Sequence, residues 1–225
     1  MPDWANPVAR YVLEEGLPGM LHVAVISLIG ATVIGVTLGS LLTIHFRPSR
    51  MLIRLYIEIF RGLPIIVTVF LVFYGLPPIS PALQFSPLNA TGIALVLWGS
   101  AQVAEATRGA VGSIPYEQHE AASALGFGWI GRHRYVILPQ ALRRLLPPLV
   151  SLLVNIIQNT TLAAVLGGLE LLSAASRQNE RVAAVPPIGT GQIHALEIFG
   201  GLAVVFFVIS FPLTRLAAYL ERRLV

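Results

Sequence analysis

Neither cysteine nor lysine occurs among the 225 residues of this chain. Without cysteine, the protein can form no disulfide framework and no thiolate metal site. Without lysine, it cannot supply the phosphate-binding lysine of a Walker A motif. Any ATP site of that type must therefore belong to a partner chain.

Charge is also scarce. Only 12% of the residues are charged, 55% are hydrophobic, and the mean hydropathy is +0.75, whereas soluble domains carry roughly 25% charged residues. Three stretches, 16–46, 62–104 and 145–169, contain no Asp, Glu, Lys or Arg at all. This composition is typical of an integral membrane protein.

The uncharged stretches set the number of membrane-spanning helices. About 20 apolar residues cross a bilayer as a helix, so the first and third stretches hold one span each and the second holds most of two. Residues 193–214 supply a fifth. We predict a single all-α transmembrane domain over residues 1–225, with five helices at about 18–45, 56–76, 88–108, 146–168 and 193–216. In the first span, Gly30, Gly35 and Gly39 mark a face that another helix can approach closely.

The arginines predict the orientation. If the N-terminus lies outside and five helices follow, the inner segments carry twelve of the fifteen arginines, and the outer segments carry only Arg10, Arg177 and Arg181. Cytoplasmic loops are enriched in basic residues. The C-terminus is therefore predicted to be cytoplasmic, and the net charge of +4 needs no nucleic-acid partner.

A polar segment at 115–143 falls on the cytoplasmic side in this topology. Residues 117–125 are rich in helix formers, Gly126 and Gly128 then interrupt them, and Pro139 opens a further helix. The pattern predicts a helix, a glycine break and a second helix. Such a short helix either transmits force from a partner into the spans or lies on the inner leaflet as an amphipathic anchor. His119 and His133 lie fourteen residues apart, and no third possible metal ligand stands at a matching spacing. The sequence therefore does not indicate a metal site.

The pattern ExxRG occurs twice, once at the inner end of the second span and once at the inner end of the third. It pairs Glu58 with Arg61 and Glu105 with Arg108. Residues three apart on a helix are neighbours, so each Glu can reach its own Arg. The pairs either stabilise the helix ends or form gate contacts that change with conformation.

The fourth span has a polar face. Ser151, Asn155, Gln158 and Asn159 share one side of a helix by their spacing, and Thr160 and Thr161 follow. Polar groups at membrane depth face protein or a water-filled cavity. They therefore either bond to a neighbouring helix or line a substrate path.

The segment 115–143 also carries a motif with fixed spacing. Glu120-Ala121-Ala122 is followed after three residues by Gly126, and after nine more by Val136, one residue, and Leu138-Pro139. This resembles the EAA loop of bacterial ABC importer permeases, with Val136 in the usual Ile position. Further similarities to amino-acid-type permeases of the histidine/glutamine/arginine group are 58–64 (EIFRGLP), 104–109, 113–115, 137–142, 147–148 and 169–171 (LEL).

The resemblance implies a type I ABC importer permease, a non-catalytic subunit of the bacterial inner membrane that moves a polar amino acid or close analogue into the cell. Its implied partners are an ABC ATPase dimer that binds ATP and Mg, a second permease copy or sister permease, an extracytoplasmic amino-acid-binding protein and membrane lipid. The residues implied in ATPase coupling are Glu117, Glu120, Ala121, Ala122, Gly126, Leu138 and Pro139.

Two departures bear on substrate. Gln158-Asn159 stand where relatives often have Lys-Asp, and 100–102 (SAQ) stand where Gly-Ala-Tyr is common, so the substrate cannot be copied from the family. The alternative function is an ion-driven secondary amino-acid transporter. That class usually shows intramembrane acids and inverted repeats. Here Glu197 by itself is weak support, and no inverted repeat is visible in the sequence.

Overall fold

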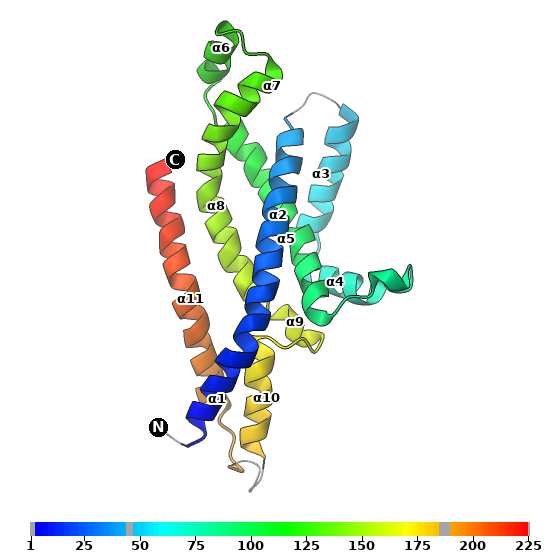
Figure 1. Cartoon of the computed structure of the whole chain (residues 1–225), viewed down its shortest axis with the longest axis vertical. Helices are drawn as coiled ribbons and strands as arrows, with labels where there is room; N and C mark the ends of the chain where they lie inside the picture. The colour runs from blue at the N-terminus through cyan, green and yellow to red at the C-terminus, as the bar shows by residue number, and fades with distance from the viewer. Residues whose placement is uncertain (1–2, 44–46, 185–189, 225) are drawn as a thin grey trace. The chain divides into compact units, whose positions relative to one another are not determined.

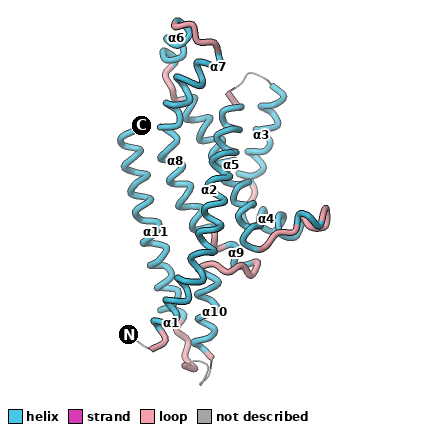
Figure 2. Tube along the Cα trace, in the orientation of Figure 1, coloured by secondary structure: helices cyan, strands magenta, loops and turns pink. Residues whose placement is uncertain are grey.

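The computed structural model describes residues 3–43, 47–184 and 190–224, and within these ranges the chain forms helices and turns without any strand (Figures 1 and 2). The all-α prediction is therefore confirmed. The chain divides into two compact units. Unit 1 is Met1–Ser27, Ile65–Leu95 and Val154–Pro212, and unit 2 is Leu28–Pro64, Val96–Leu153 and Leu213–Val225.

Four long helices contribute to both units: α2 (Leu17–Leu41), α5 (Pro87–Gly112), α8 (Leu138–Asn159) and α11 (Ala195–Leu224). The other elements of unit 1 are α1 (Ala5–Tyr11), π-helical turns at Val12–Gly16 and Leu71–Gly75, α4 (Ile65–Phe70), a 3₁₀ turn at Pro81–Leu83, α9 (Leu162–Val165) and α10 (Leu171–Ala183). Those of unit 2 are α3 (Arg47–Gly62), α6 (Tyr116–Ala124), α7 (Trp129–Arg132) and a π-helical turn at His133–Ile137.

In unit 1, α10 begins at a buried carboxylate. Glu170 is 0% exposed and accepts hydrogen bonds from the backbone N–H groups of Leu172 (2.9 Å) and Ser173 (2.8 Å). The Ser173 hydroxyl in turn accepts from the Glu170 N–H, which completes a capping box. Burial raises the pKa of Glu170, and the two backbone N–H groups partly oppose that rise. Gly16 leaves room for this turn, because a Cβ there would lie 2.9 Å from Leu171 Cα.

In unit 2, α2 packs closely on α5 along the predicted glycine face. A Cβ at Gly30 would lie 2.6 Å from Val96, and one at Gly39 would lie 2.5 Å from the Ala104 carbonyl oxygen. A Cβ at Gly35 would likewise clash with the Val103 side chain. Small residues allow this approach of the two backbones, so the prediction of a close helix contact is confirmed.

Several helices are long and apolar enough to cross a lipid bilayer. Within the described ranges, Ala5–Leu41, Trp129–Val165 and Ala195–Leu224 are long and apolar enough to cross a bilayer, and 47–62 with 65–75 adds a fourth if the pair counts as one span. Helix α5 has 26 residues, or about 39 Å at 1.5 Å per residue. The five-span count and the orientation stay predictions, and residues 44–45 of the predicted first span lie outside the described ranges.

The predicted second span, 56–76, is not one helix. Helix α3 ends at Gly62 and α4 begins at Ile65. Pro64 has no N–H to donate and disfavours the helical conformation at the residue before it. The chain therefore leaves the helix at Leu63-Pro64.

Candidate functional site

The polar segment 115–143 folds as the sequence predicts, into a helix, a glycine break and a second helix (Figure 1). Pro115, with φ −56° and ψ 142°, precedes α6 and sets its start. After the break come α7, the π-helical turn His133–Ile137 and α8. Residues 115–143 all belong to unit 2.

Gly126 ends α6 in the left-handed conformation, with φ +83°. The Gly126 N–H donates to the Ser123 carbonyl (3.0 Å), and the Phe127 N–H donates to the Ala122 carbonyl (3.1 Å). These two bonds form a Schellman motif, which favours glycine because other residues are strained at positive φ. The spacing between the EAA triplet and its glycine thus has a local cause, since the last alanine of the triplet accepts the closing bond.

The motif residues divide into an exposed set and a packed one. Glu117, Glu120 and Ala121 are exposed, whereas Ala122 is only 2% exposed. Gly126 and Pro139 are also exposed, and Leu138 is half-buried. The carboxylates therefore point away from the protein, and Ala122 holds α6 to its support.

Two large apolar side chains flank this exposed set. Leu125 is 78% exposed and Ile130 is 74% exposed. Exposed apolar side chains that gather into a patch mark sites of interaction with another protein or with a membrane. The sequence reasoning missed both residues, although apolar side chains beside the two glycines of a polar loop were the available signal.

Hydrogen bonds between side chains fix α6 to its neighbours. Gln140 of α8 donates to Gln118 of α6 (3.2 Å), and Arg132 of α7 donates to the Ser123 hydroxyl (2.9 Å). These links pass through residues that the motif does not contain. These bonds couple the position of α6 to those of α7 and the start of α8.

The start of α8 is joined as firmly to the end of α5. Arg144 donates to the Ser113 carbonyl (2.7 Å) and to its hydroxyl (3.0 Å). A buried apolar cluster fills the space between the two helices and comprises Ala110, Val111, Ile114, Ile137, Ala141 and Leu145. A force on α6 therefore reaches both α5 and α8.

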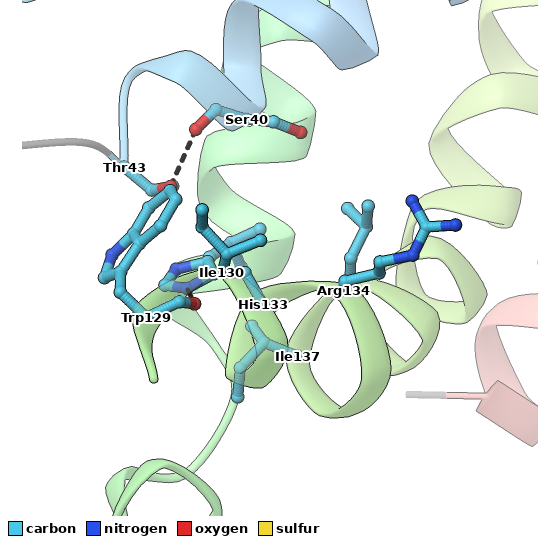
Figure 3. Close-up of a pocket in the computed structure, with 9 residues that line it drawn as sticks. Ser40, Thr43, Trp129, Ile130, His133, Arg134 and Ile137 are labelled. Atoms are coloured by element: carbon cyan, nitrogen blue, oxygen red, sulfur yellow. Dashed lines mark hydrogen bonds between the residues drawn. The ribbon is translucent and has the colours of Figure 1, made fainter. Parts of the chain in front are cut away.

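The segment also contacts the end of α2. Trp129 and His133 line a cavity of about 240 Å³ together with Ser40 and Thr43 (Figure 3). The His133 ring nitrogen Nδ1 bonds to the Trp129 carbonyl (2.9 Å), and the ring centroids of these two residues are 4.1 Å apart. The Thr43 hydroxyl donates to the Ser40 carbonyl (2.7 Å). The end of α2 therefore contacts the segment 115–143, which we call the coupling segment after the role that the family resemblance implies for it.

Only one of the two predicted gate pairs is formed. Arg108 donates from Nε (3.0 Å) and from Nη2 (2.6 Å) to the Glu105 carboxylate. No ion pair within 4.0 Å joins Glu58 to Arg61, and both side chains are exposed. An exposed pair at this spacing gains at most about 1 kcal/mol, so side-chain entropy is enough to separate them.

The predicted path residues of α8 have different environments. Ser151, in unit 2, is exposed, and so are Asn155 and Gln158 in unit 1. Thr160 is 0% exposed, and its hydroxyl donates to the Ile157 carbonyl (2.8 Å), so the exposed polar face does not include it. The remaining two side chains also bond to carbonyls of their own turn, Asn159 to Asn155 and Thr161 to Gln158.

Comparison with known proteins identifies the family. The family described as "Binding-protein-dependent transport system inner membrane component" matches residues 20–225. The glutamine transport system permease protein GlnP of Escherichia coli (strain K12) is 36% identical over 223 residues, which cover 99% of this chain and 97% of GlnP. The probable glutamine ABC transporter permease protein GlnM of Bacillus subtilis (strain 168) is 29% identical over 210 residues, or 93% of this chain and 92% of GlnM.

A solved structure agrees in fold over the same length. The structure titled "Crystal structure of an amino acid ABC transporter with histidines" superposes with a TM-score of 0.81 and 25% identity, covering 99% of each chain. The expected importer-permease fold is confirmed, and the alternative of an ion-driven secondary transporter finds no support. The chain belongs to the family of binding-protein-dependent transport system inner membrane components.

Proposed function

We propose that this chain is the non-catalytic permease subunit of an ATP-driven importer and that it moves a polar amino acid such as glutamine into the cell. The observation that carries this proposal is the exposed tip of 117–130. There, Glu117, Glu120 and Ala121 stand beside exposed Leu125 and Ile130.

The chemistry of this tip suits a protein partner better than lipid. Helix α6 (YEQHEAASA) contains no large aliphatic side chain, so it lacks the apolar stripe with which an amphipathic helix enters a leaflet. Carboxylates next to two apolar anchors can pair with basic residues and fill pockets of a partner. The hydrogen bonds and packing that join this segment to α5, α8 and the end of α2 then transmit the motion of that partner to the membrane-spanning helices.

The partner that supplies the energy is an ABC ATPase dimer. This chain has no lysine for a Walker A site, so ATP and Mg bind to the ATPase subunits. A second permease copy or a sister permease completes the membrane part, and an extracytoplasmic amino-acid-binding protein delivers the substrate. The family description names dependence on a binding protein, which supports this last partner.

The substrate class rests on the relatives and on α8. GlnP and GlnM are named for glutamine transport, and the exposed face of α8 offers the neutral amide of Gln158. An amide can bond to the ammonium, carboxylate or side chain of a zwitterion without holding any of them tightly. If Gln158 and Asn159 line the path, Gln158→Ala and Asn159→Ala will alter the order in which amino acids compete for uptake, and an unchanged order would remove them from it.

Affinity purification of the tagged chain from its own membranes tests the main proposal. A Walker A ATPase should co-purify with the wild type and be lost with Glu120→Arg, which reverses an exposed charge at the tip. Glu221→Arg, an exposed change of the same charge on the predicted cytoplasmic end of α11, should retain the ATPase. Folded wild-type protein without any ATPase would contradict the proposal.

A further inference from the structure

A second feature of unit 2 lies beside the coupling segment. It is a hollow of about 760 Å³, within the size range of small-molecule sites. Arginines and aromatic rings form most of its wall. Its charged and aromatic lining residues are Arg50, Arg54, Arg108, Arg132, Tyr116, His119, Trp129 and His133.

The hollow carries uncompensated positive charge. Of its arginines, Arg108 is neutralised by Glu105, but no hydrogen bond or ion pair joins the side chain of Arg50 or Arg54 to another described residue. Arg132 donates from Nη1 to a hydroxyl, and its Nε is buried without any partner. No carboxylate is among the described residues that line the hollow. The Glu105 carboxylate also interacts electrostatically with Arg54, but one carboxylate cannot balance the four guanidinium groups that line this space.

The positive charges near the hollow also act on the His119 side chain. Burial lowers the pKa of His119, and the charges of Arg132 and His133 lower it further. Several guanidinium groups around one space suit an anion with several acceptor oxygens, such as a phosphate.

The surface next to the hollow is apolar. On α3, Arg47, Arg50 and Arg54 recur at helical spacing and share one face. Met51 and Leu55, which follow on the adjacent side of the same helix, are 75% and 56% exposed. Charge and exposed apolar surface thus lie next to each other on one short helix, which fits an amphiphile and not a free phosphate.

We propose that this hollow, which we call the arginine hollow, binds the phosphate headgroup of an anionic phospholipid while the acyl chains lie along Met51 and Leu55. The arginine distribution puts this end of unit 2 on the cytoplasmic side. The cytoplasmic leaflet is the anionic one, and basic pockets on that side hold lipid headgroups. The lipid would fix α3 beside the coupling segment, because Arg132 and His133 line the same hollow.

Native mass spectrometry of the purified full-length chain in a non-ionic detergent tests the proposal. The protein is titrated with phosphatidylglycerol, with phosphatidylcholine of the same acyl chains, and with glycerol phosphate. The double variant Arg50→Gln/Arg54→Gln removes two headgroup contacts. Arg222→Gln/Arg223→Gln, at the exposed end of α11, removes the same charge outside the hollow and is the matched control.

We expect the wild type and the control to prefer phosphatidylglycerol. The Arg50/Arg54 variant should lose about fivefold in affinity for each arginine, or roughly thirtyfold in all, with little change toward phosphatidylcholine. Arg50→Lys/Arg54→Lys retains the positive charge and should keep most of the preference for phosphatidylglycerol. This variant shows whether the loss in the Gln variant comes from the lost charge or from a folding defect.

Three results would overturn the proposal. Equal affinity of the wild type for both lipids would exclude headgroup selection. Glycerol phosphate binding as tightly as phosphatidylglycerol would identify the ligand as a free phosphate compound. A shift from dimer to monomer in the Arg50/Arg54 variant, with lipid binding unchanged, would assign this surface to a second permease. None of these readouts requires an ATPase or transport, so they are independent of the proposed function.

Discussion

Replacement of Gly126 by alanine isolates the backbone requirement of the coupling segment. The residue has φ +83°, and a Cβ built on it meets no atom within 4 Å. The substitution therefore adds no clash, and its whole effect is the strain of an L-residue in the left-handed region. Gly128 is the matched control, because it also has open space around it but has φ −65° and ψ 175°, which any residue adopts.

The left-handed conformation costs about 1–2 kcal/mol for a residue with a Cβ. That free energy opposes the turn that closes α6, so the Gly126→Ala turn should open about 5- to 30-fold more often than the wild-type turn. Gly128→Ala should leave the opening unchanged. Gly126→Asn should lie between the wild type and Gly126→Ala, because asparagine tolerates this region better than alanine does.

Amide hydrogen exchange of the purified chain measures the opening directly. The N–H groups of Gly126 and Phe127 close the Schellman motif, so their exchange should quicken in Gly126→Ala by the stated factor. If the proposed function is right, coupled ATP hydrolysis in the assembled transporter should fall in the same order of variants. Equal exchange rates in Gly126→Ala and Gly128→Ala would refute the reasoning at its first step.

Three further predictions concern other parts of unit 2. Gly39→Ala should destabilise the protein by about 1–3 kcal/mol through overpacking and lower its Tm, whereas Gly109→Ala, which meets no atom within 4 Å, should not; equal Tm values would contradict the close packing of α2 on α5. Burial and positive neighbours lower the pKa of His119 from 6.5, so the unfolded chain binds more protons below that pH, and stability should fall as the pH drops through 6.5; a His119→Gln variant with the same pH dependence of Tm would refute this. Glu105→Gln should impair transport and coupled ATP hydrolysis more than Glu58→Gln, because only Glu105 holds its arginine; if both variants remain fully active, neither pair acts at a gate.

Local pattern was enough for several features of this protein. The uncharged stretches predicted an all-α membrane protein because a bilayer core excludes unpaired charge and backbone groups. The break at Gly126 and the close approach at Gly30, Gly35 and Gly39 were also predictable, because each depends on the residue itself being glycine. The motif around Glu120 and the family resemblance followed from residue identity and spacing alone.

The features that depend on partners far away in the sequence were decided only by the tertiary structure. Identical ExxRG patterns gave one bidentate ion pair, at Glu105, and one open pair, at Glu58. The bond from Arg144 to Ser113 spans 31 residues, and the sequence showed Arg144 only as one more inner charge. The arginine hollow likewise exists because α3 and α7 lie in the same unit. Spacing along a chain sets which side chains share a helix face, but distances between helices set which charges find a partner.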